Sequence, residues 1–372
     1  MSGLNGFMHG IRVVDLSQYI PGPLASLILA DLGAEVIKIE PPAGDQMRTL
    51  GPRDKEGRPV FYRALNAGKI ARRMDLKVPE VRAEFLRVVE TADVLIESFR
   101  PGVMSRLRLD YATLSAVNPR LVYCSMSGYG ATSPLARAAG HDGNYLALTG
   151  VLDRNGLDAP FFYDPPIADV SGSLFAAIAI LGALHGRQKT GMGCEIDLGL
   201  ADGLMLLQLL QVAAFGANGT VPKRAGTYLN GGAAYYRVYR TSDARFVMLG
   251  AVEPKFWQAF CAAADHPDWV ARQSEPIPQT ALLSDVAGFF ARLTLSQSIA
   301  RFSQADCCFS PVLDLGEALS SIPIRERGLV REGPADDLQA LFPALVDGEA
   351  PRPREVMREF DRDASMVRDA SR

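Results

Sequence analysis

The sequence predicts an α/β fold in which a large domain carries a Rossmann-like parallel sheet and a smaller domain is α+β. Short apolar runs alternate with helical patterns over the first third of the chain, at the spacing of βαβ units. Beyond the middle of the chain, this alternation gives way to a hairpin pattern followed by amphipathic helices. The first observation predicts the parallel sheet, and the second predicts a separate domain.

The first βαβ unit spans residues 11–40. Residues 11–16 form a short apolar run typical of a buried strand, and residues 35–40 predict a second strand. Between them, residues 24–32 have helical spacing after the turn at 21–23, where prolines are placed to end the strand and start a helix. Gly33 is typical of the residue that follows a helix. This order predicts parallel strands joined by a crossover helix.

The alternation continues toward the middle of the chain. It predicts, in order, helix 79–91, strand 94–96, helix 111–117, strand 121–123, and helices 172–187 and 199–216. The dinucleotide fingerprint GxGxxG is missing from residues 17–23, which follow the first strand. A nicotinamide cofactor is therefore not expected.

The smaller domain begins with a hairpin at 235–250, which turns around Ser242 and Asp243. Amphipathic helices are expected near 254–264, 280–292 and 296–304. We expect a strand at 311–313 and a helix at 317–320 to return to the first sheet, and the tail from Pro351 to be solvated or wrapped on a surface. The predicted division is a large domain at 1–200 and 311–372, a linker helix at 201–219, and a small domain at 220–310.

Composition narrows the classes of protein to consider. A net charge of −3 excludes a generally basic nucleic-acid binder. The N-terminus lacks the apolar run of a secretory peptide, and the most apolar stretch, 174–184, is about half the ~20 residues that a bilayer requires. Five scattered cysteines show no CxxC pair and no metal spacing. We therefore expect a cytoplasmic protein without disulfides, metal, nucleic-acid partner or membrane partner.

His141 is the histidine whose surroundings point to chemistry. It follows a loop, precedes a helical stretch, and stands beside Asp142, which is well placed to cap that helix. Free N–H groups at a helix start stabilise a developing oxyanion, and a base beside them is what proton abstraction next to a carbonyl requires. A capping aspartate with a packed histidine is the alternative. His9, His185 and His266 fit surface or helix-end positions.

Two carboxylates are further candidates, and each has a structural alternative. Asp169 follows a short apolar run and leads the helix at 172–187, so it either caps that helix or lies at a strand end over the ligand-binding edge of the sheet. Glu253 stands between a strand and a helix, where the helix dipole by itself favours an acidic residue.

Several motifs, read together, carry a resemblance. Some lie at 10–17, 21–23, 30–40, 75–77, 92–103, 118–123 and 128–130, and others at 140–152, 231–236 and 250–256. With the first set, the chain resembles the family III CoA-transferase (CaiB/BaiF) superfamily over nearly its full length. With the second set, it resembles the α-methylacyl-CoA racemase branch of that superfamily.

The resemblance implies transfer of a proton at the α-carbon of a 2-methylacyl-CoA thioester, through an enolate. His141 and Asp169 match the acid–base pair, and Glu253, alongside Asp142, matches the acid that orients the histidine. In transferase relatives, the position of Asp169 is a nucleophile that forms covalent intermediates. A CoA-transferase acting between carboxylic acids is therefore the alternative, and a CoA-binding protein without catalysis is a third possibility.

The resemblance also implies how CoA is held, as the thioester part of the substrate and with no redox or metal cofactor. Pro41 stands where an arginine is usual in the superfamily, so Arg48, Arg53 or Arg100 is expected to replace that charge. The residues implied for CoA binding are Lys77, Phe99, Arg100, Arg106 and Tyr145.

The resemblance further implies a homodimer of two interlocked rings. In this arrangement each active site lies between the large domain of one subunit and the small domain of the other. His141 and Asp169 would then meet the partner's Glu253.

Overall fold

The computed structural model describes residues 3–360, which form two compact units. The first unit contains residues up to 148, residues 163–207 and residues from 322 onward; the second contains 149–162 and 208–321. The predicted small domain at 220–310 lies inside the second unit, which also includes 149–162, 208–219 and 311–321. The residues predicted as one linker helix form two helices, α8 (Leu200–Leu207) and α9 (Leu209–Asn218), on either side of Gln208.

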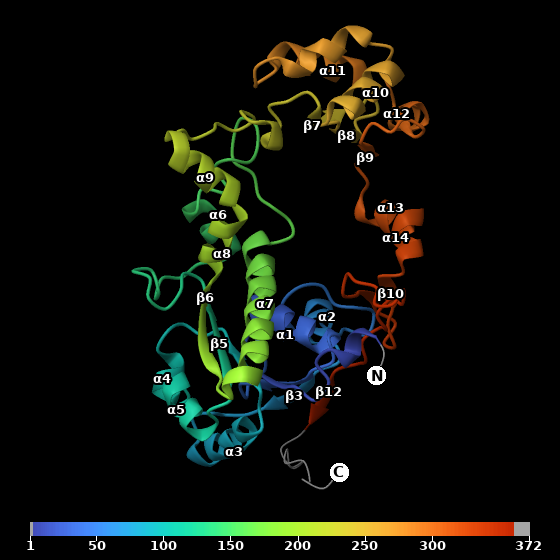
Figure 1. Cartoon of the computed structure of the whole chain (residues 1–372). Helices are drawn as coiled ribbons and strands as arrows, with labels where there is room; N and C mark the ends of the chain where they lie inside the picture. The colour runs from blue at the N-terminus through green and yellow to red at the C-terminus, as the bar shows by residue number, and fades with distance from the viewer. Residues whose placement is uncertain (1–2, 361–372) are drawn as a thin grey trace. The chain divides into compact units, whose positions relative to one another are not determined.

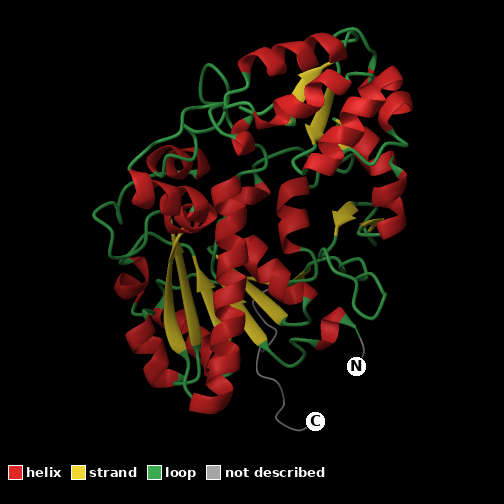
Figure 2. Ribbon diagram, turned by 45° about the horizontal axis from the view of Figure 1, so that its top comes forward, coloured by secondary structure: helices red, strands yellow, loops and turns green. Residues whose placement is uncertain are grey.

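A parallel sheet organises the first unit (Figures 1 and 2), as the sequence predicts. Within the described residues it has seven strands in the order β12-β3-β2-β1-β4-β5-β6, and every neighbouring pair is parallel. The strands are β1 (Arg12–Asp15), β2 (Glu35–Glu40), β3 (Ile70–Arg73), β4 (Val94–Glu97), β5 (Val122–Ser127), β6 (Cys194–Gly199) and β12 (Arg358–Phe360). The strand order reverses direction between β1 and β4, as in a Rossmann fold.

Helices cover both faces of this sheet because its central strands are apolar on both sides (Figure 2). One face packs on α3 (Pro79–Glu90) and α5 (Tyr111–Val117), with Val14, Leu95 and Phe85 in the shared core. Residues next to these in the strands, such as Val13, point to the opposite face. On that face, α1 (Pro21–Asp31) packs against β1 and α7 (Ile167–Thr190), and α7 packs against β5.

Shorter elements complete the first unit. Gly33 has a φ of 106°, which confirms the glycine predicted after the first helix. The remaining elements are the helices α2 (Val60–Asn66), α4 (Val103–Leu107), α6 (Asp142–Leu148) and α14 (Ile322–Arg327), the 3₁₀ turns η1 (Leu4–Gly6) and η2 (Gln46–Arg48), and the hairpin β10 (Val330–Glu332) and β11 (Leu338–Ala340).

The long helix α7 differs from its prediction at both ends. It has 24 residues and begins at Ile167, so Asp169 lies in its first turn and not at the end of a strand. By length and composition alone it could span a bilayer. Small residues on one side, among them Ser173 and Ala176, are buried against the unit. This packing gives it the place of a core helix.

The second unit has a three-stranded antiparallel sheet with helices packed on it. The expected hairpin is confirmed as β7 (Tyr236–Arg240) and β8 (Phe246–Gly250). Trp257, Phe260 and Phe290 form an aromatic core under the sheet. Its other elements are β9 (Phe309–Pro311), α10 (Pro254–Ala264), α11 (Thr280–Phe290), α12 (Leu295–Phe302), α13 (Leu315–Ser320), η3 (Tyr228–Asn230) and η4 (Pro267–Ser274).

One expectation about the C-terminal part of the chain is wrong. The strand near 311 does not return to the first sheet; β9 pairs with β8 in the second unit, because Phe309 joins the aromatic core there. The strand that does join the first sheet is β12, an exposed edge strand in the tail, which was expected to be solvated or wrapped on a surface. An ion pair of 2.6 Å between Arg354 and Asp31 anchors that tail to α1. Residues 361–372 of the tail lie outside the described residues.

Candidate active site

The carboxyl ends of β1 and β4 mark where a ligand is expected in a sheet of this order, because the loops that follow them leave in opposite directions. Two of the cavities formed by the described residues lie there. One, of about 390 Å³, is lined by His141 and Asp169, and we call it the histidine cavity. The other, of about 660 Å³, is lined by Lys77 and Arg106, and we call it the lysine cavity. Gln18 and Phe99 line both cavities, so the two adjoin.

His141 is exposed on the wall of the histidine cavity, directly before α6. Its main chain is fixed: its N–H donates to the Asn144 Oδ1 over 3.0 Å, and its carbonyl accepts from the Asn144 N–H over 2.8 Å. The imidazole forms no hydrogen bond or ion pair within residues 3–360. The ring is therefore accessible to a ligand and is not the packed histidine of the structural alternative.

Asp142 has a different structural role from the one predicted. Its own helix, α6, is capped by Asn144, whose side chain reaches back to His141. The Asp142 Oδ1 instead accepts from the N–H groups of Ala168 and Asp169, at 2.6 and 3.2 Å, and so caps α7. The sequence suggested that Asp142 caps its own helix. Its carboxylate oxygen instead accepts from the start of a helix that lies 26 residues further along the chain. Asp142 thereby ties the segment that carries His141 to the helix that carries Asp169.

Asp169 is partly buried in the first turn of α7, where its carboxyl faces the histidine cavity. Burial raises its pKa to about 7, and the nearby negative charge of Asp142 adds to the shift. Near neutral pH the carboxyl therefore exists in both protonation states, which suits a group that alternately donates and accepts a proton.

The charge of Asp142 can be separated from its capping role. Asp142→Asn keeps an oxygen acceptor for α7 and removes the charge, so we expect the pKa of Asp169 to fall below 7 while the free energy of unfolding changes by less than about 1 kcal/mol. Asp142→Ala also removes the acceptor and should cost about 1–2 kcal/mol. Carboxyl NMR titration and urea unfolding measure the two effects. If the pKa of Asp169 is unchanged in Asp142→Asn, the charge of Asp142 does not contribute to the shift.

Tyr145, implied as a CoA-binding residue, lines the histidine cavity from its buried side. Its hydroxyl donates to the Gly140 carbonyl over 2.7 Å, and burial raises its pKa to about 12. The ring lies so close to Gly128 and Gly140 that a Cβ at either position would come within 3 Å of it. Tyr145 therefore shapes the cavity wall, and the two glycines make room for it.

The lysine cavity contains two of the charged residues implied for CoA binding, Lys77 and Arg106. Exposed Lys77 comes from the loop after β3 and exposed Arg106 from α4, and Phe99 lines both this cavity and the histidine cavity. Arg100 is exposed and lines the histidine cavity. Two cationic side chains therefore border the larger, more apolar cavity, and one borders the smaller.

Comparison with known proteins is consistent with this geometry. Residues 8–355 match the family described as CoA-transferase family III. The chain belongs to CoA-transferase family III. Alpha-methylacyl-CoA racemase of Homo sapiens is 34% identical over 331 residues, 86% of this chain and 81% of that protein. Acetyl-CoA:oxalate CoA-transferase of Acetobacter aceti is 33% identical over 330 residues, 84% of this chain and 82% of that protein. A solved CAIB/BAIF family protein from Brucella suis has a TM-score of 0.82 at 27% identity, covering 94% of this chain and 95% of that one.

Membership in family III fixes the substrate class as CoA thioesters, which members use without a metal or redox cofactor. Within residues 3–360, no group of three or more His, Cys, Asp or Glu side chains is arranged to hold a metal ion. Racemases and transferases are both among the relatives, at similar identity, so family membership alone does not choose between the two reactions.

Of the arginines expected to replace the one missing after Glu40, two are already engaged. Arg48 forms ion pairs with Glu40 and Glu359 at 2.8 and 2.9 Å. Arg53 donates to the carbonyls of Gly57 and Arg48. Neither lines the histidine or the lysine cavity. Of the three arginines, Arg100 therefore remains the candidate to supply the missing positive charge to a CoA ligand.

Glu253 belongs to the second unit, whereas His141 and Asp169 belong to the first. It is the exposed residue that precedes α10, and its side chain makes no capping hydrogen bond. Its carbonyl accepts from the N–H groups of Phe256 and Trp257, which start the helix. The carboxylate is therefore available for another partner, although its place at the start of α10 also fits the helix-dipole alternative.

Sequence reasoning missed three polar residues of the cavities: Gln18, Tyr19 and Ser98. The Gln18 N–H donates to the Ser98 Oγ over 3.0 Å, which joins the loops after β1 and β4. Tyr19 lines the histidine cavity with a φ of 64°. A signal was present, because Gln18 and Ser98 each follow a predicted strand closely and neighbouring parallel strands end at the same edge.

Proposed function

We propose that this family III protein is an acyl-CoA racemase that moves the α-proton of a 2-methylacyl-CoA thioester through an enolate. The observation that carries the proposal is that an exposed imidazole, His141, and a carboxyl with a pKa of about 7, Asp169, line one cavity. Proton transfer to and from both faces of one carbon requires two acid–base groups that reach that carbon.

In the proposed reaction, one group removes the α-proton and the other returns a proton to the opposite face. When His141 is the base, its nitrogen takes the proton and the C–H electron pair forms the enolate. Protonated Asp169 then gives its proton to the α-carbon from the other side. The reverse direction exchanges the two roles, so no co-reactant is consumed.

The environment of Asp169 favours this reaction over transfer of CoA. A carboxylate nucleophile acts in its ionised form, so burial and a neighbouring negative charge work against it. The same two factors keep a proton on Asp169 at neutral pH, as an acid requires. Transfer between carboxylic acids, with Asp169 as the nucleophile, remains the second candidate because transferases are among the relatives.

We propose that the CoA part of the substrate occupies the lysine cavity. Lys77 and Arg106 would contact its phosphates, since cationic side chains form charge-assisted hydrogen bonds with phosphate. The pantetheine arm would pass Gln18 and Phe99, which border both cavities, and bring the thioester to His141 and Asp169.

The proposal is tested by incubating the protein with (2R)-2-methylacyl-CoA in deuterated water. Deuterium at C2 with loss of stereochemistry is the expected result. If CoA instead moves onto an added carboxylate and no deuterium enters C2, the protein is a CoA-transferase and not a racemase. Neither reaction, with CoA still bound, would identify a binding protein. Each outcome is read from the same sample by mass spectrometry and chiral chromatography.

We also propose the homodimer that the resemblance implies, because large apolar side chains are exposed on helices of both units. Examples are Ile178 of α7 (63% exposed) and Leu210 of α9 (65% exposed). Apolar exposure on this scale marks interaction surfaces. The partner's Glu253 would complete each site. Light scattering should give the mass of two chains, and the mass of one chain would contradict the proposal.

A further inference from the structure

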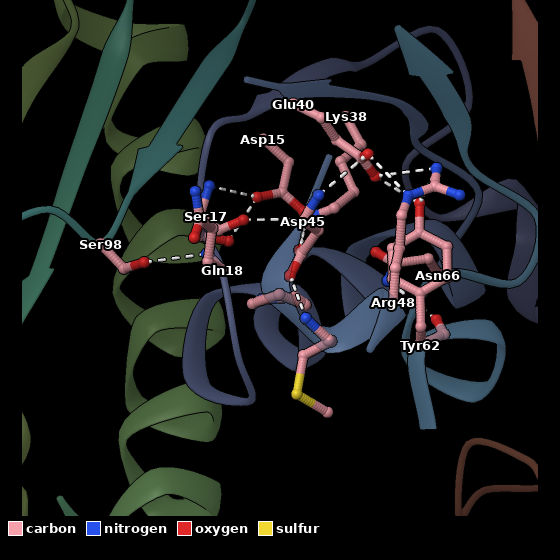
Figure 3. Close-up of polar contacts among 12 residues, drawn as sticks. Asp15, Ser17, Gln18, Lys38, Glu40, Asp45, Arg48, Tyr62, Asn66 and Ser98 are labelled. Carbon is pink, nitrogen blue, oxygen red and sulfur yellow. Dashed lines mark hydrogen bonds and ion pairs between the residues drawn. The ribbon is translucent and has the colours of Figure 1, made fainter. Parts of the chain in front are cut away.

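Four charged side chains are buried together beside the two cavities, near the carboxyl ends of β1 and β2, and Figure 3 labels three of them, Asp15, Lys38 and Asp45. Asp15, Lys38 and Lys69 are fully buried, and Asp45 is 2% exposed. The Lys38 Nζ lies 2.8 Å from the Asp45 carboxylate, and the Lys69 Nζ lies 3.2 Å from that of Asp15. The four charges balance as two ion pairs.

Such pairs are a poor source of stability. The cost of removing two charges from water rivals their attraction, and apolar side chains of similar volume often stabilise a fold equally well. Lys69 and Asp15 also bond to Ser26 of α1, which gives that pair a place in the packing of the helix. Lys38, within β2, and Asp45, in the loop after β2, are placed differently, because they contact two loops that border the cavities.

Lys38 connects those two loops. Its Nζ donates to the Ser17 carbonyl over 2.8 Å, in the loop after β1. Its ion-pair partner Asp45 lies in the loop after β2, where the Asp45 Oδ1 accepts from the Met47 N–H over 2.9 Å. Figure 3 shows Lys38 reaching between Ser17 and Asp45.

The Ser17–Tyr19 segment is held on its other sides as well. The Ser17 N–H donates to the Asp15 carboxylate over 2.9 Å, and the Gln18 N–H donates to the Ser98 Oγ. The Tyr19 hydroxyl hydrogen-bonds to the Gln46 side chain, next to Asp45. Tyr19 also has a left-handed backbone, which is unfavourable in a residue with a side chain and persists only where its surroundings enforce it.

This segment forms part of the wall that the cavities share, together with Phe99. Gln18 lines both cavities, and Tyr19 lines the histidine cavity. A shift of the segment would therefore change both cavities at once, and misplacement by 1 Å can cost about 10²-fold in rate.

We propose that Lys38, acting through Asp45 and the Ser17 carbonyl, is a positioning residue that sets the wall between the CoA-binding and proton-transfer cavities. The assignment of the two cavities to CoA binding and proton transfer rests on the proposed function. The contacts of Lys38 with Asp45 and with the Ser17 carbonyl do not. Lys38 lines neither of the two cavities, so its effect is transmitted through the two loops that it contacts.

The test replaces the whole ion pair without leaving a buried charge. Lys38→Met with Asp45→Asn keeps the acceptor for the Met47 N–H and the volume of the lysine stem. The matched control is Arg12→Met with Glu35→Gln, which removes a 2.7 Å ion pair at the opposite ends of the same two strands. Both variants are compared with the wild type by urea unfolding, amide hydrogen exchange of the peptide around Ser17–Tyr19, CoA titration, and the α-proton exchange assay.

We expect amide exchange in the segment to accelerate by about tenfold or more in the Lys38/Asp45 variant, and CoA to bind about tenfold more weakly. The Arg12/Glu35 variant should stay within about twofold of the wild type in both measurements, whatever its stability. A folded Lys38/Asp45 variant with unchanged segment exchange and CoA affinity would overturn the proposal. So would equal losses in the control.

If the double variant does not fold, Asp45→Asn alone decides by the same two measurements, with the same expected direction. Amide exchange and CoA affinity do not depend on which reaction the protein catalyses. A wild type that binds CoA but shows no α-proton exchange would therefore refute the proposed function and leave the test of Lys38 intact.

Discussion

Replacing Asp169 by asparagine is expected to lower α-proton exchange by about 10²- to 10⁴-fold, the usual contribution of a general acid–base group. The amide has nearly the same shape as the carboxyl but neither gives nor takes a proton in this range. Binding of CoA should persist, because Asp169 lines the histidine cavity and not the lysine cavity. Steady-state kinetics and CoA titration of the variant measure both effects.

The same substitution should stabilise the fold above pH 7. The pKa of Asp169 is raised from 3.8 to about 7, so between these values the folded protein holds a proton that the unfolded chain has released. Stability therefore falls as pH rises through this window, and the full cost is present above pH 7. With about 1.4 kcal/mol per pKa unit, removing the carboxylate should raise the free energy of unfolding by on the order of 2–4 kcal/mol at pH 8 and change it little at pH 4.

The control for both effects is Glu80→Gln, which changes an exposed acid in the first turn of another helix, α3, in the same unit. It should alter neither activity nor the pH dependence of stability by a comparable amount. An Asp169→Asn variant that keeps more than about a tenth of the wild-type rate would refute the acid–base role.

Replacing His141 by alanine separates the two reactions that the relatives perform. Racemisation needs a group on each face of the α-carbon, so we expect loss of the imidazole to lower it by about 10²- to 10⁴-fold. Transfer of CoA through a carboxylate nucleophile does not need the imidazole. Asp169→Ala should abolish either reaction, which is why His141 is the residue that discriminates.

His185→Ala provides the matched control, because His185 is an exposed histidine near the far end of α7. It should leave racemisation within about twofold of the wild type. The measurement is loss of optical activity from an enantiopure 2-methylacyl-CoA, with transfer of CoA to an added carboxylate followed in parallel. Racemisation that survives His141→Ala, or CoA transfer that is lost in Asp169→Ala and retained in His141→Ala, would contradict the proposed role.

Elements with strong local patterns were predicted from the sequence. The strands at 12–15 and 35–40 and the helices at 79–90 and 254–264 each bury an apolar stripe, and a stripe of this kind is visible in the order of residues. The strands β3 and β6 escaped prediction for different reasons: IARR contains only two apolar residues, whereas CEIDLG alternates apolar and polar residues, a half-buried strand signal that sequence reasoning overlooked. The edge strand β12 escaped because its pairing partner is almost 300 residues away in the chain.

For the candidate site, too, the sequence predicted one part and missed another. His141 and Asp169 were singled out by residue type and resemblance, but their roles as cap or catalyst stayed open in the sequence. In the structure the cap of α7 is Asp142, so Asp169 is free to line the cavity beside His141. The shift in the pKa of Asp169 depends on burial and on a charge 27 residues away, which no local pattern encodes.

The sequence by itself determined the family, the parallel sheet and the chemical types of residue at the site, because these follow from local periodicity and from short motifs. Only the tertiary structure decided which side chains share a cavity, which arginines are already paired, and which buried lysine holds the wall between two cavities. The physical reason is that burial and charge pairing act across space, between residues that chain order leaves far apart.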